Sequence, residues 1–298
     1  MVARSWYPTV RSSALPVGAV RVCELGPRRV VLYRDHDGQA HALDARCPHL
    51  GADLAQGTVT RDGLRCAFHG WSFGADGACR SAPGHAVPPD RCARTYPVDE
   101  RWRFVWIFNG PAPLFPLPEP DPARTWRALA LPPQQVACHP HVVLANGLDL
   151  QHYETVHGMR FEAPPRLRVD APFEVSVEMC GRPAGRAGRL LSGTTRRPIR
   201  ARFTTIGGSL AWSTVVSPTE FHVLFTGRPD RHGVCVTQTI FLFPSRPGWR
   251  WARALALMAT LLHHDRRVLD AIDFRPAFAD SDAPMRAFAE VVNALGAW

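Results

Sequence analysis

The chain has 298 residues, 35 basic and 26 acidic side chains, a formal net charge of +9, and 46% hydrophobic residues. This length is sufficient for two domains that each bury a core. Every basic residue is arginine, and because these arginines are scattered and no nucleic-acid-binding motif accompanies them, the charge does not indicate a nucleic-acid partner.

Neither a membrane span nor a secretory leader is expected. The longest apolar candidate, residues 251–262, is interrupted by Arg253 and is too short to cross a bilayer. Residues 1–6 lack the apolar core of a signal peptide. We therefore expect a cytoplasmic protein in which the cysteines other than Cys47 and Cys66 are reduced thiols.

The first third of the chain has the pattern of a small all-β domain. Between residues 15 and 110, short apolar runs alternate with Gly, Pro and Asp turns. Expected strands include residues 30–33, 41–43 and 102–108.

Two Cys and two His lie in this domain in two short loops. The first is Cys47-x-His49, and the second, after residues 50–65, is Cys66-x-x-His69. A glycine follows shortly after the histidine in each loop. Thiolate and imidazole donors suit zinc or an iron–sulfur cluster. A Cys₂His₂ zinc finger groups its cysteines together and its histidines together, so the alternation favours a Rieske-type [2Fe–2S] cluster over zinc and over chance.

With these two loops, the sequence resembles the Rieske non-haem iron oxygenases. Respiratory Rieske proteins carry one more cysteine in each loop, joined as a disulfide. Here those positions are Ala52 and Phe68, so that bridge cannot form. Trp71 stands where the respiratory proteins place a hydroxyl that donates to the cluster. Both departures favour the oxygenase branch.

A second motif follows a proline-rich stretch at residues 111–125, which we expect to be a stiff linker. His152 and His157 are five residues apart, which is about 140° around a regular helix. Both rings therefore reach one ion only at a helix end or at a π-type irregularity, and Gly158 is a plausible helix stop. Two His and one carboxylate on one face of Fe(II) leave positions open for O₂ and substrate.

Asn146, Asp149, His152 and His157 also match the catalytic-domain signature of the same family, N-x-x-D-x-x-H-x-x-x-x-H. Asp149 precedes His152 by one helical turn, close enough to hydrogen-bond its second ring nitrogen. The resemblance implies that Asp149 links His152 to the partner subunit's His69, in a homotrimer without a second type of subunit. Asn146 is expected beside the iron ligands.

The third iron ligand is expected from a carboxylate farther along the chain. The resemblance to the branch of dicamba monooxygenase and vanillate demethylase favours Asp265, which Val268 and Asp270 follow in the register of that branch. Asp270 is the next candidate and Asp273 the last. The alternative is a solvated acid that pairs with a neighbouring arginine, and the adjacent histidines at 263 and 264 are expected to be bystanders.

The rest of the chain is expected to form an antiparallel sheet and a helix. Its β-branched and aromatic runs are residues 174–179, 201–205, 210–216, 221–226 and 234–243. A buried helix is expected from residue 251 towards Asp265. The arginine-rich stretch at 181–200 is a candidate contact for an acidic electron-transfer partner or an anionic substrate, or simply an exposed loop.

The predicted fold class is α+β. An N-terminal all-β Rieske [2Fe–2S] domain occupies residues 1–110. After the linker, a catalytic domain at 126–298 has a curved antiparallel sheet wrapped by helices and holds the mononuclear iron.

The resemblance implies a terminal oxygenase that receives electrons from NAD(P)H through a separate flavin-containing reductase, with or without a ferredoxin, since no nucleotide-binding fingerprint is present. Its Rieske cluster and Fe(II) would use O₂ to hydroxylate or oxidatively demethylate a small organic molecule. Aromatic cis-dihydroxylation is the alternative reaction, and a Rieske ferredoxin-type electron carrier is the alternative class. The sequence does not identify the substrate.

Overall fold

The computed structural model describes residues 2–87, 89–183, 198–217, 220–244, 249–270, 272–273, 275 and 277–296. The chain divides into two compact units, one formed by residues up to Leu117 with 229–232, and the other by 118–228 with 233–297. The division falls inside the proline-rich stretch 111–125, which contains neither helix nor strand. Its first half packs on the first unit, because the Trp6 indole donates to the Phe115 carbonyl at 2.8 Å.

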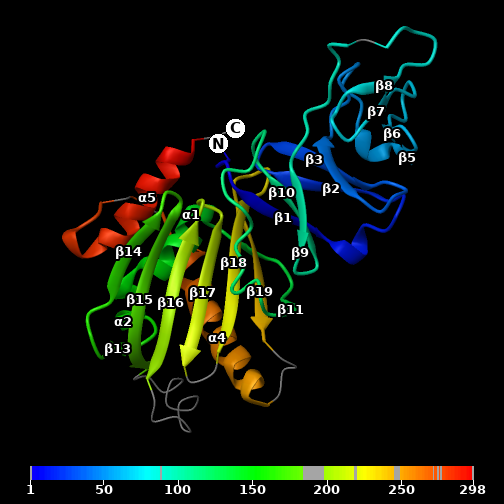
Figure 1. Ribbon diagram of the computed structural model, residues 1–298. Coiled ribbons are helices and arrows are strands. Elements are labelled where there is room, and N and C mark those ends of the chain that lie inside the picture. Colours follow the sequence, from blue (N-terminus) through cyan, green and yellow to red (C-terminus); the bar gives the residue numbers. More distant parts are fainter. Residues whose placement is uncertain are drawn as a thin grey trace. The chain divides into compact units, whose positions relative to one another are not determined.

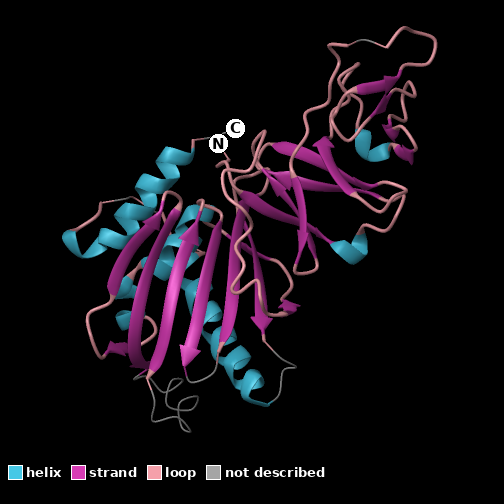
Figure 2. Ribbon diagram, viewed as in Figure 1, coloured by secondary structure: helices cyan, strands magenta, loops and turns pink. Residues whose placement is uncertain are grey.

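The first unit is built from three small antiparallel sheets (Figures 1 and 2). Their strand orders are β1-β10-β9, β2-β3-β4 and β5-β6-β7-β8. The strand bounds are β1 Trp6–Arg11, β2 Val20–Leu25, β3 Arg28–Arg34, β4 Ala40–Asp44, β5 Thr58–Thr60, β6 Gly63–Arg65, β7 Ser72–Phe73, β8 Cys79–Ser81, β9 Val98–Arg101 and β10 Phe104–Phe108. Two short 3₁₀ helices, Ser12–Ala14 and Leu54–Gln56, complete the unit.

Two hydrophobic cores stabilise this unit. One packs β2 and β3 against β10, with Leu25, Val30 and Val105 among its fully buried side chains. The other packs β3 and β4 against β6 and β7, and it includes the two motif cysteines, Cys47 and Cys66. The cysteine-containing loops are therefore anchored in a packed interior, where each fully buried large apolar side chain contributes roughly 1.5–3 kcal/mol.

The expected strand at 102–108 is shorter than predicted, because a tight turn interrupts it. Trp102 and Arg103 have φ angles of 49° and 72°, and Arg101 pairs with Phe104 across the hairpin. Two consecutive positive φ angles match the right-handed twist of the flanking strands. This turn has no sequence signal, since neither position is Gly, Asn or Asp.

The second unit is one large antiparallel sheet with helices. The strand order is β11-β19-β18-β17-β16-β15-β13, with β12 pairing β19 and β14 pairing β15. The strand bounds are β11 Arg127–Ala130, β12 Gln134–Val136, β13 Met159–Phe161, β14 Arg166–Ala171, β15 Glu174–Pro183, β16 Ile199–Ile206, β17 Leu210–Ser217, β18 Phe221–Pro229 and β19 Cys235–Phe243. The helices are α1 Pro140–Ala145, the 3₁₀ turn η3 Asn146–Leu148, α2 Leu150–Thr155, α4 Trp249–Leu269, the 3₁₀ turn η4 Asp280–Asp282 and α5 Ala283–Leu295.

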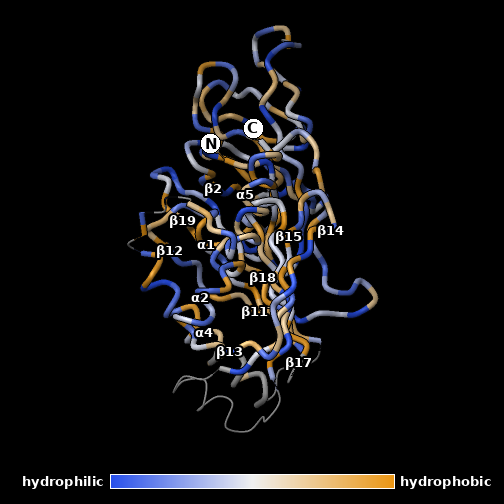
Figure 3. The backbone as a smooth tube through the Cα atoms, turned by 90° about the vertical axis from the view of Figure 1, so that its left-hand side faces the viewer, coloured by the Kyte–Doolittle hydropathy of each residue, from blue (hydrophilic) through white to orange (hydrophobic). Residues whose placement is uncertain are grey.

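The helices α1, α2 and α4 lie on the same side of this sheet, as two views at right angles show (Figures 1 and 3). Leu255 and Met258 of α4 pack against buried side chains of β17, β18 and β19. The described side chains of α4 are nevertheless half-buried or exposed except for Leu269. The expectation of a buried helix was therefore wrong: α4 is an amphipathic helix that covers the sheet with one face.

The predicted fold class is confirmed, with a β-rich N-terminal part and a sheet covered by helices. The five expected strand runs after residue 174 correspond to β15 through β19. None of the eight cysteines forms a disulfide within the chain. In the part of the chain that the structure describes, no helix is long and apolar enough to span a membrane. Most of the arginine-rich stretch 181–200 lies outside the described residues.

The β9–β10 turn generates the first prediction. Exposed Arg103 has a φ of 72°, which costs a non-glycine residue about 1 kcal/mol or more. Arg103→Gly should therefore stabilise the hairpin by about 0.5–1 kcal/mol, measured as slower amide hydrogen exchange over residues 98–108. Thr58→Gly, at an exposed position within β5, is the control and should destabilise its strand instead. Faster exchange in Arg103→Gly would contradict this account of the turn.

Candidate functional site

The two cysteine-containing loops of the first unit close in the same way. The Cys47 amide donates to the Ala52 carbonyl at 2.8 Å, and the Gly51 amide donates back to the Cys47 carbonyl at 2.9 Å. In the second loop the corresponding bonds, at 2.8 and 3.1 Å, join Cys66 to the residues five and four positions later. Gly51 and Gly70 have φ angles of 77° and 71°, which explains the glycine that ends each motif.

These loops bring the Cys47 thiol beside that of Cys66, and the His49 ring beside that of His69. Cys47 and Cys66 are each 3% exposed, whereas His69 lies at the surface. The rings of His49 and His69 are 4.7 Å apart between centroids. The His49 ring also stacks on the indole of Trp71, with a centroid distance of 4.1 Å and an interplanar angle of 4°.

The chemistry of this group fits a [2Fe–2S] cluster with two thiolate and two imidazole ligands. Burial, reinforced by the neighbouring Cys66 thiol, raises the pKa of the Cys47 thiol to about 11, so a bound metal is needed to hold it as a thiolate. Burial and the nearby His69 lower the pKa of His49, which favours the neutral imidazole that a ligand must be. The Nδ1 atom of His49 is buried without a hydrogen-bonding partner, as suits a nitrogen that binds metal.

The second motif lies at the short helix α2, and the helix ends between the two histidines. Asp149 caps α2, because its Oδ1 accepts a hydrogen bond from the His152 backbone amide at 3.0 Å. The helix ends at Thr155, so His157 follows it, and Gly158 has a φ of 61°. The expected helix end is confirmed, and it turns the two imidazoles towards one point.

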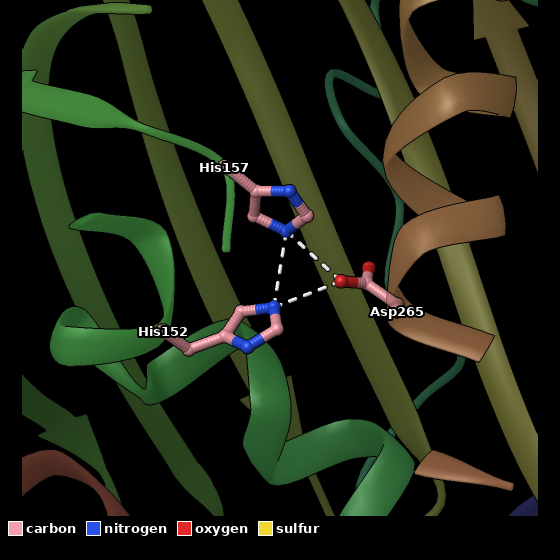
Figure 4. Close-up of side chains that lie close together, drawn as sticks. All are labelled: His152, His157 and Asp265. Atoms are coloured by element: carbon pink, nitrogen blue, oxygen red, sulfur yellow. Dashed lines mark hydrogen bonds and ion pairs between the residues drawn. The ribbon is translucent and has the colours of Figure 1, made fainter. Parts of the chain in front are cut away.

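Asp265 of α4 completes a triad with these histidines (Figure 4). Its Oδ1 lies 2.8 Å from the Nε2 of His152 and 2.9 Å from the Nε2 of His157. The two Nε2 atoms are 3.0 Å apart. Ligands at adjacent positions of an octahedral ion, each about 2.1 Å from it, are about 3.0 Å from one another. The triad therefore has the spacing of three ligands on one face of a metal ion.

Hydrogen bonds alone do not account for this cluster of atoms. The Nε2 of His152 lies within 3.3 Å of the Asn146 side-chain nitrogen, the His157 Nε2 and the Asp265 Oδ1, yet it holds at most one proton. Burial raises the pKa of Asp265, but the hydrogen bonds from His152 and His157 outweigh it and leave that pKa below its ordinary value. The result is a carboxylate facing two imidazoles, a donor set that fits Fe(II).

The other acids considered for the third ligand lie apart from the triad. Asp270 accepts hydrogen bonds from the Ala137 amide at 3.0 Å and from the Arg266 Nε at 3.2 Å. Asp273 is exposed and pairs with Arg275. Among the described residues, only Asp265 brings a carboxylate to both imidazoles.

Within the chain, Asp149 does not make the hydrogen bond to the His152 ring that was expected. Its carboxylate bonds to the backbone amide of His152, and no hydrogen bond joins it to that imidazole in the described part of the chain. The reason is helix geometry: a residue that directly precedes a helix has its side chain beside the free amides of the first turn.

A cavity of about 120 Å³ adjoins the triad, between the sheet and the helices η3, α2 and α4. Its wall is mainly apolar, with contributions from Phe203, Phe225 and Leu262, and with hydroxyl groups from strands β17 to β19. Gly147 also lines it, and a Cβ there would lie 2.1 Å from the Phe203 ring. The motif glycine thus lets the wall of the sheet approach the turn that carries Asn146.

Most of these wall residues could not be recognised from the sequence. Tyr153 is one of them. Its half-buried side chain places the ring 5.9 Å from the His157 ring between centroids, and its hydroxyl donates to the Gly147 carbonyl at 3.3 Å. Its place inside the motif was the only sequence signal. The remaining wall residues come from strands and helices far apart in the chain, for which no local pattern exists.

Known proteins match the cysteine-containing unit in sequence and the chain in fold. The Rieske [2Fe–2S] domain family matches residues 5–97. The 5,5'-dehydrodivanillate O-demethylase oxygenase subunit of Sphingobium sp. is 33% identical over 167 residues, which are 53% of this chain and 39% of that protein. Cholesterol 7-desaturase of Bombyx mori is 34% identical over 157 residues, 51% of this chain and 35% of that protein. The alignments thus span little more than a third of these relatives.

The solved structure of dicamba monooxygenase bound to dicamba superimposes with a TM-score of 0.75 at 21% identity, covering 99% of this chain and 97% of that one. At this identity the likeness establishes the fold. Residues 5–97 therefore form a Rieske [2Fe–2S] domain, and the chain as a whole has the fold of dicamba monooxygenase, in agreement with its resemblance to the Rieske non-haem iron oxygenases.

Proposed function

We propose that this chain is the terminal oxygenase component of a Rieske-type monooxygenase system, with Cys47, His49, Cys66 and His69 as cluster ligands. The observation that carries the proposal is the triad of His152, His157 and Asp265, whose ligand atoms lie 2.8 to 3.0 Å apart beside a cavity. When bound, the cluster supplies electrons and a mononuclear Fe(II) supplies the activation of O₂. A structure of dicamba monooxygenase that contains non-haem iron has the same fold.

The surrounding residues orient the ligands and restrict water. The carboxylate of Asp265 is 19% exposed, and the two imidazoles are 6% and 4% exposed, so few water molecules reach the site. Asn146 approaches His152 Nε2 at 3.3 Å, and Tyr153 packs beside both rings. The apolar cavity wall would then position a small organic substrate beside the open face of the triad.

The reaction that we favour is hydroxylation or oxidative demethylation of that substrate, as the match to an O-demethylase oxygenase subunit suggests. Cis-dihydroxylation is the alternative, and the match to the oxygenase subunit of 3-chlorobenzoate-3,4-dioxygenase, which is 38% identical over 120 residues, keeps it open. A pure electron carrier is disfavoured, because it would have no use for a cavity and a triad in the second unit.

Electrons would come from NAD(P)H through a flavin-containing reductase, directly or through a ferredoxin, in the cytoplasm. The proposal includes a homotrimer, in which the Asp149 oxygen that does not cap α2 would bond to the His152 ring and link it to the partner subunit's His69. Two observations support this part: His69 lies at the surface, and Asp149 needs only one of its oxygens for capping α2.

The separate metal sites yield a prediction. His157→Ala should remove the mononuclear iron, about one iron per chain, and leave the red-brown cluster spectrum intact, because the two ligand sets share no residue. Iron analysis and the visible absorption spectrum of the purified protein measure the two effects. His263→Ala is the matched control, since exposed His263 is outside the triad and should change neither quantity.

Substitution of a cysteine tests the other site. Cys66→Ser should bleach the cluster spectrum, whereas loss of that spectrum in His157→Ala would show that the two sites are not separate. A zinc protein would be colourless in every variant, and that outcome would overturn the proposed function.

The cluster potential is the third prediction. Trp71 stacks on His49 and offers no hydroxyl to a cluster sulfur, so the reduced cluster lacks one stabilising donor. The midpoint should be near the lower end of the Rieske range, about −150 mV rather than about +300 mV. A redox titration with a strongly positive midpoint would argue against the oxygenase branch.

Asp149 yields the fourth prediction. Asparagine caps helices as well as aspartate does, so Asp149→Asn should preserve α2 and both metals. Its amide lacks the charge to orient the imidazole pair, and turnover should fall by at least about tenfold. Single-turnover experiments with a pre-reduced cluster measure the rate of cluster oxidation, which should fall in parallel.

Asp149→Ala separates this function from capping. It removes the cap as well, so it should also lower the thermal stability, by roughly 1 kcal/mol at the helix. Wild-type cluster oxidation and product formation in Asp149→Asn would leave Asp149 with the structural task of capping alone.

A further inference from the structure

One positively charged side chain lines the cavity beside the triad. The residues of α4 that face this cavity recur every three or four positions, and they are Met258, Leu261, Leu262, Asp265, Arg266 and Leu269. The other polar groups of the wall, outside the triad and Asn146, are uncharged, for example Gln134, Ser213 and Thr239. Among the described residues, Arg266 is thus the only arginine that reaches this space.

The guanidinium of Arg266 is held at one edge. Its Nε donates to Asp270 Oδ2 at 3.2 Å, and the other oxygen of Asp270 accepts from the Ala137 amide at 3.0 Å. Asp270 is therefore fixed to the segment before α1 and fixes Arg266 in turn. In the described part of the chain, no other acidic group pairs with this arginine.

This arrangement leaves most of the guanidinium available. Arginine has five N–H donors, and the bond to Asp270 uses the one on Nε, so the four donors on the terminal nitrogens remain. The side chain is 47% exposed, which places it where the cavity meets solvent. A guanidinium held in this way presents two parallel N–H groups, the pattern that a carboxylate or sulfonate matches.

The rest of the cavity suits the apolar body of such a molecule. Phe203, Phe225 and Leu262 form apolar wall, and the hydroxyls of β17 to β19 offer neutral hydrogen bonds. A small organic anion would place its charged end at Arg266 and its apolar part beside the triad. A second cationic side chain is not needed to bind such an anion. The triad contributes only one carboxylate, so a divalent ion bound there would leave a net positive charge.

We propose that Arg266, held by Asp270, is the specificity-determining residue of this cavity and selects organic carboxylates or sulfonates with a small apolar body. This inference rests on the proposed function for its reaction, but ligand binding tests it without turnover.

Isothermal titration calorimetry on the purified full chain under anaerobic conditions is the test. The probes are benzoate, 3-methoxybenzoate and 4-methoxybenzoate, each paired with the amide of the same shape. The wild-type protein should bind at least one acid about tenfold or more tightly than its amide. Arg266→Gln should abolish that preference while leaving the affinity for the amide unchanged.

Two further variants test whether the preference for acids depends on a guanidinium at position 266 or on any positive charge nearby. Arg267→Gln is the matched control, because Arg267 is exposed, adjacent and outside the cavity wall, and it should keep the preference. Arg266→Lys keeps the charge but loses the paired donors, so it should retain only part of the preference. Far-UV circular dichroism establishes that each variant is folded.

The outcomes distinguish this inference from the proposed function. Equal binding of acids and amides by the wild-type protein, no binding of any acid, or the same loss in Arg267→Gln as in Arg266→Gln would overturn the assignment of Arg266. Selective binding of acids in protein that neither holds iron at the triad nor turns over would overturn the proposed function and leave Arg266 as an anion-binding residue.

Discussion

The second unit depends on one constraint: three electronegative atoms meet at one point, and hydrogen bonds among them cannot satisfy all three. Two imidazole nitrogens and a carboxylate oxygen lie 2.8 to 3.0 Å apart in a poorly exposed site. Protons can pair only some of these contacts, and buried polar groups that remain unpaired are costly. A divalent cation would satisfy all three at once, which is why we propose a metal site at this point.

The rest of the unit is arranged to keep that point in place. Asp149 begins α2 and Gly158 follows its end, so the helix is just long enough to separate His152 from His157. The third side chain comes from α4, which packs on the sheet through Leu255 and Met258. The site therefore depends on the docking of α4 on the strands, and the cavity is the space between the same elements.

In the first unit, backbone hydrogen bonds hold the two cysteine-containing loops in place. Each cysteine is part of the hydrophobic core, and each loop is closed by a matched pair of hydrogen bonds with a glycine in the left-handed region. These backbone bonds hold each loop in a shape that directs its cysteine and its histidine to the same side. The histidines lie nearer the surface than the cysteines, which is where an electron would enter or leave in the proposed function.

The sequence by itself determined the features that depend on residues close together along the chain. The spacing of Cys47 to His69 and of Asn146 to His157 indicated two metal sites, alternating apolar runs indicated β15 to β19, and helix geometry required the helix to end between His152 and His157. Only the tertiary structure decided among the three acids near the end of α4, because that choice depends on which side chain faces elements more than a hundred residues away. The turn at Trp102 and Arg103 and the capping bond of Asp149 are local, but their residue types did not single them out. The wall that places Arg266 beside the triad was set by packing between distant segments, and such packing leaves no local pattern in the sequence.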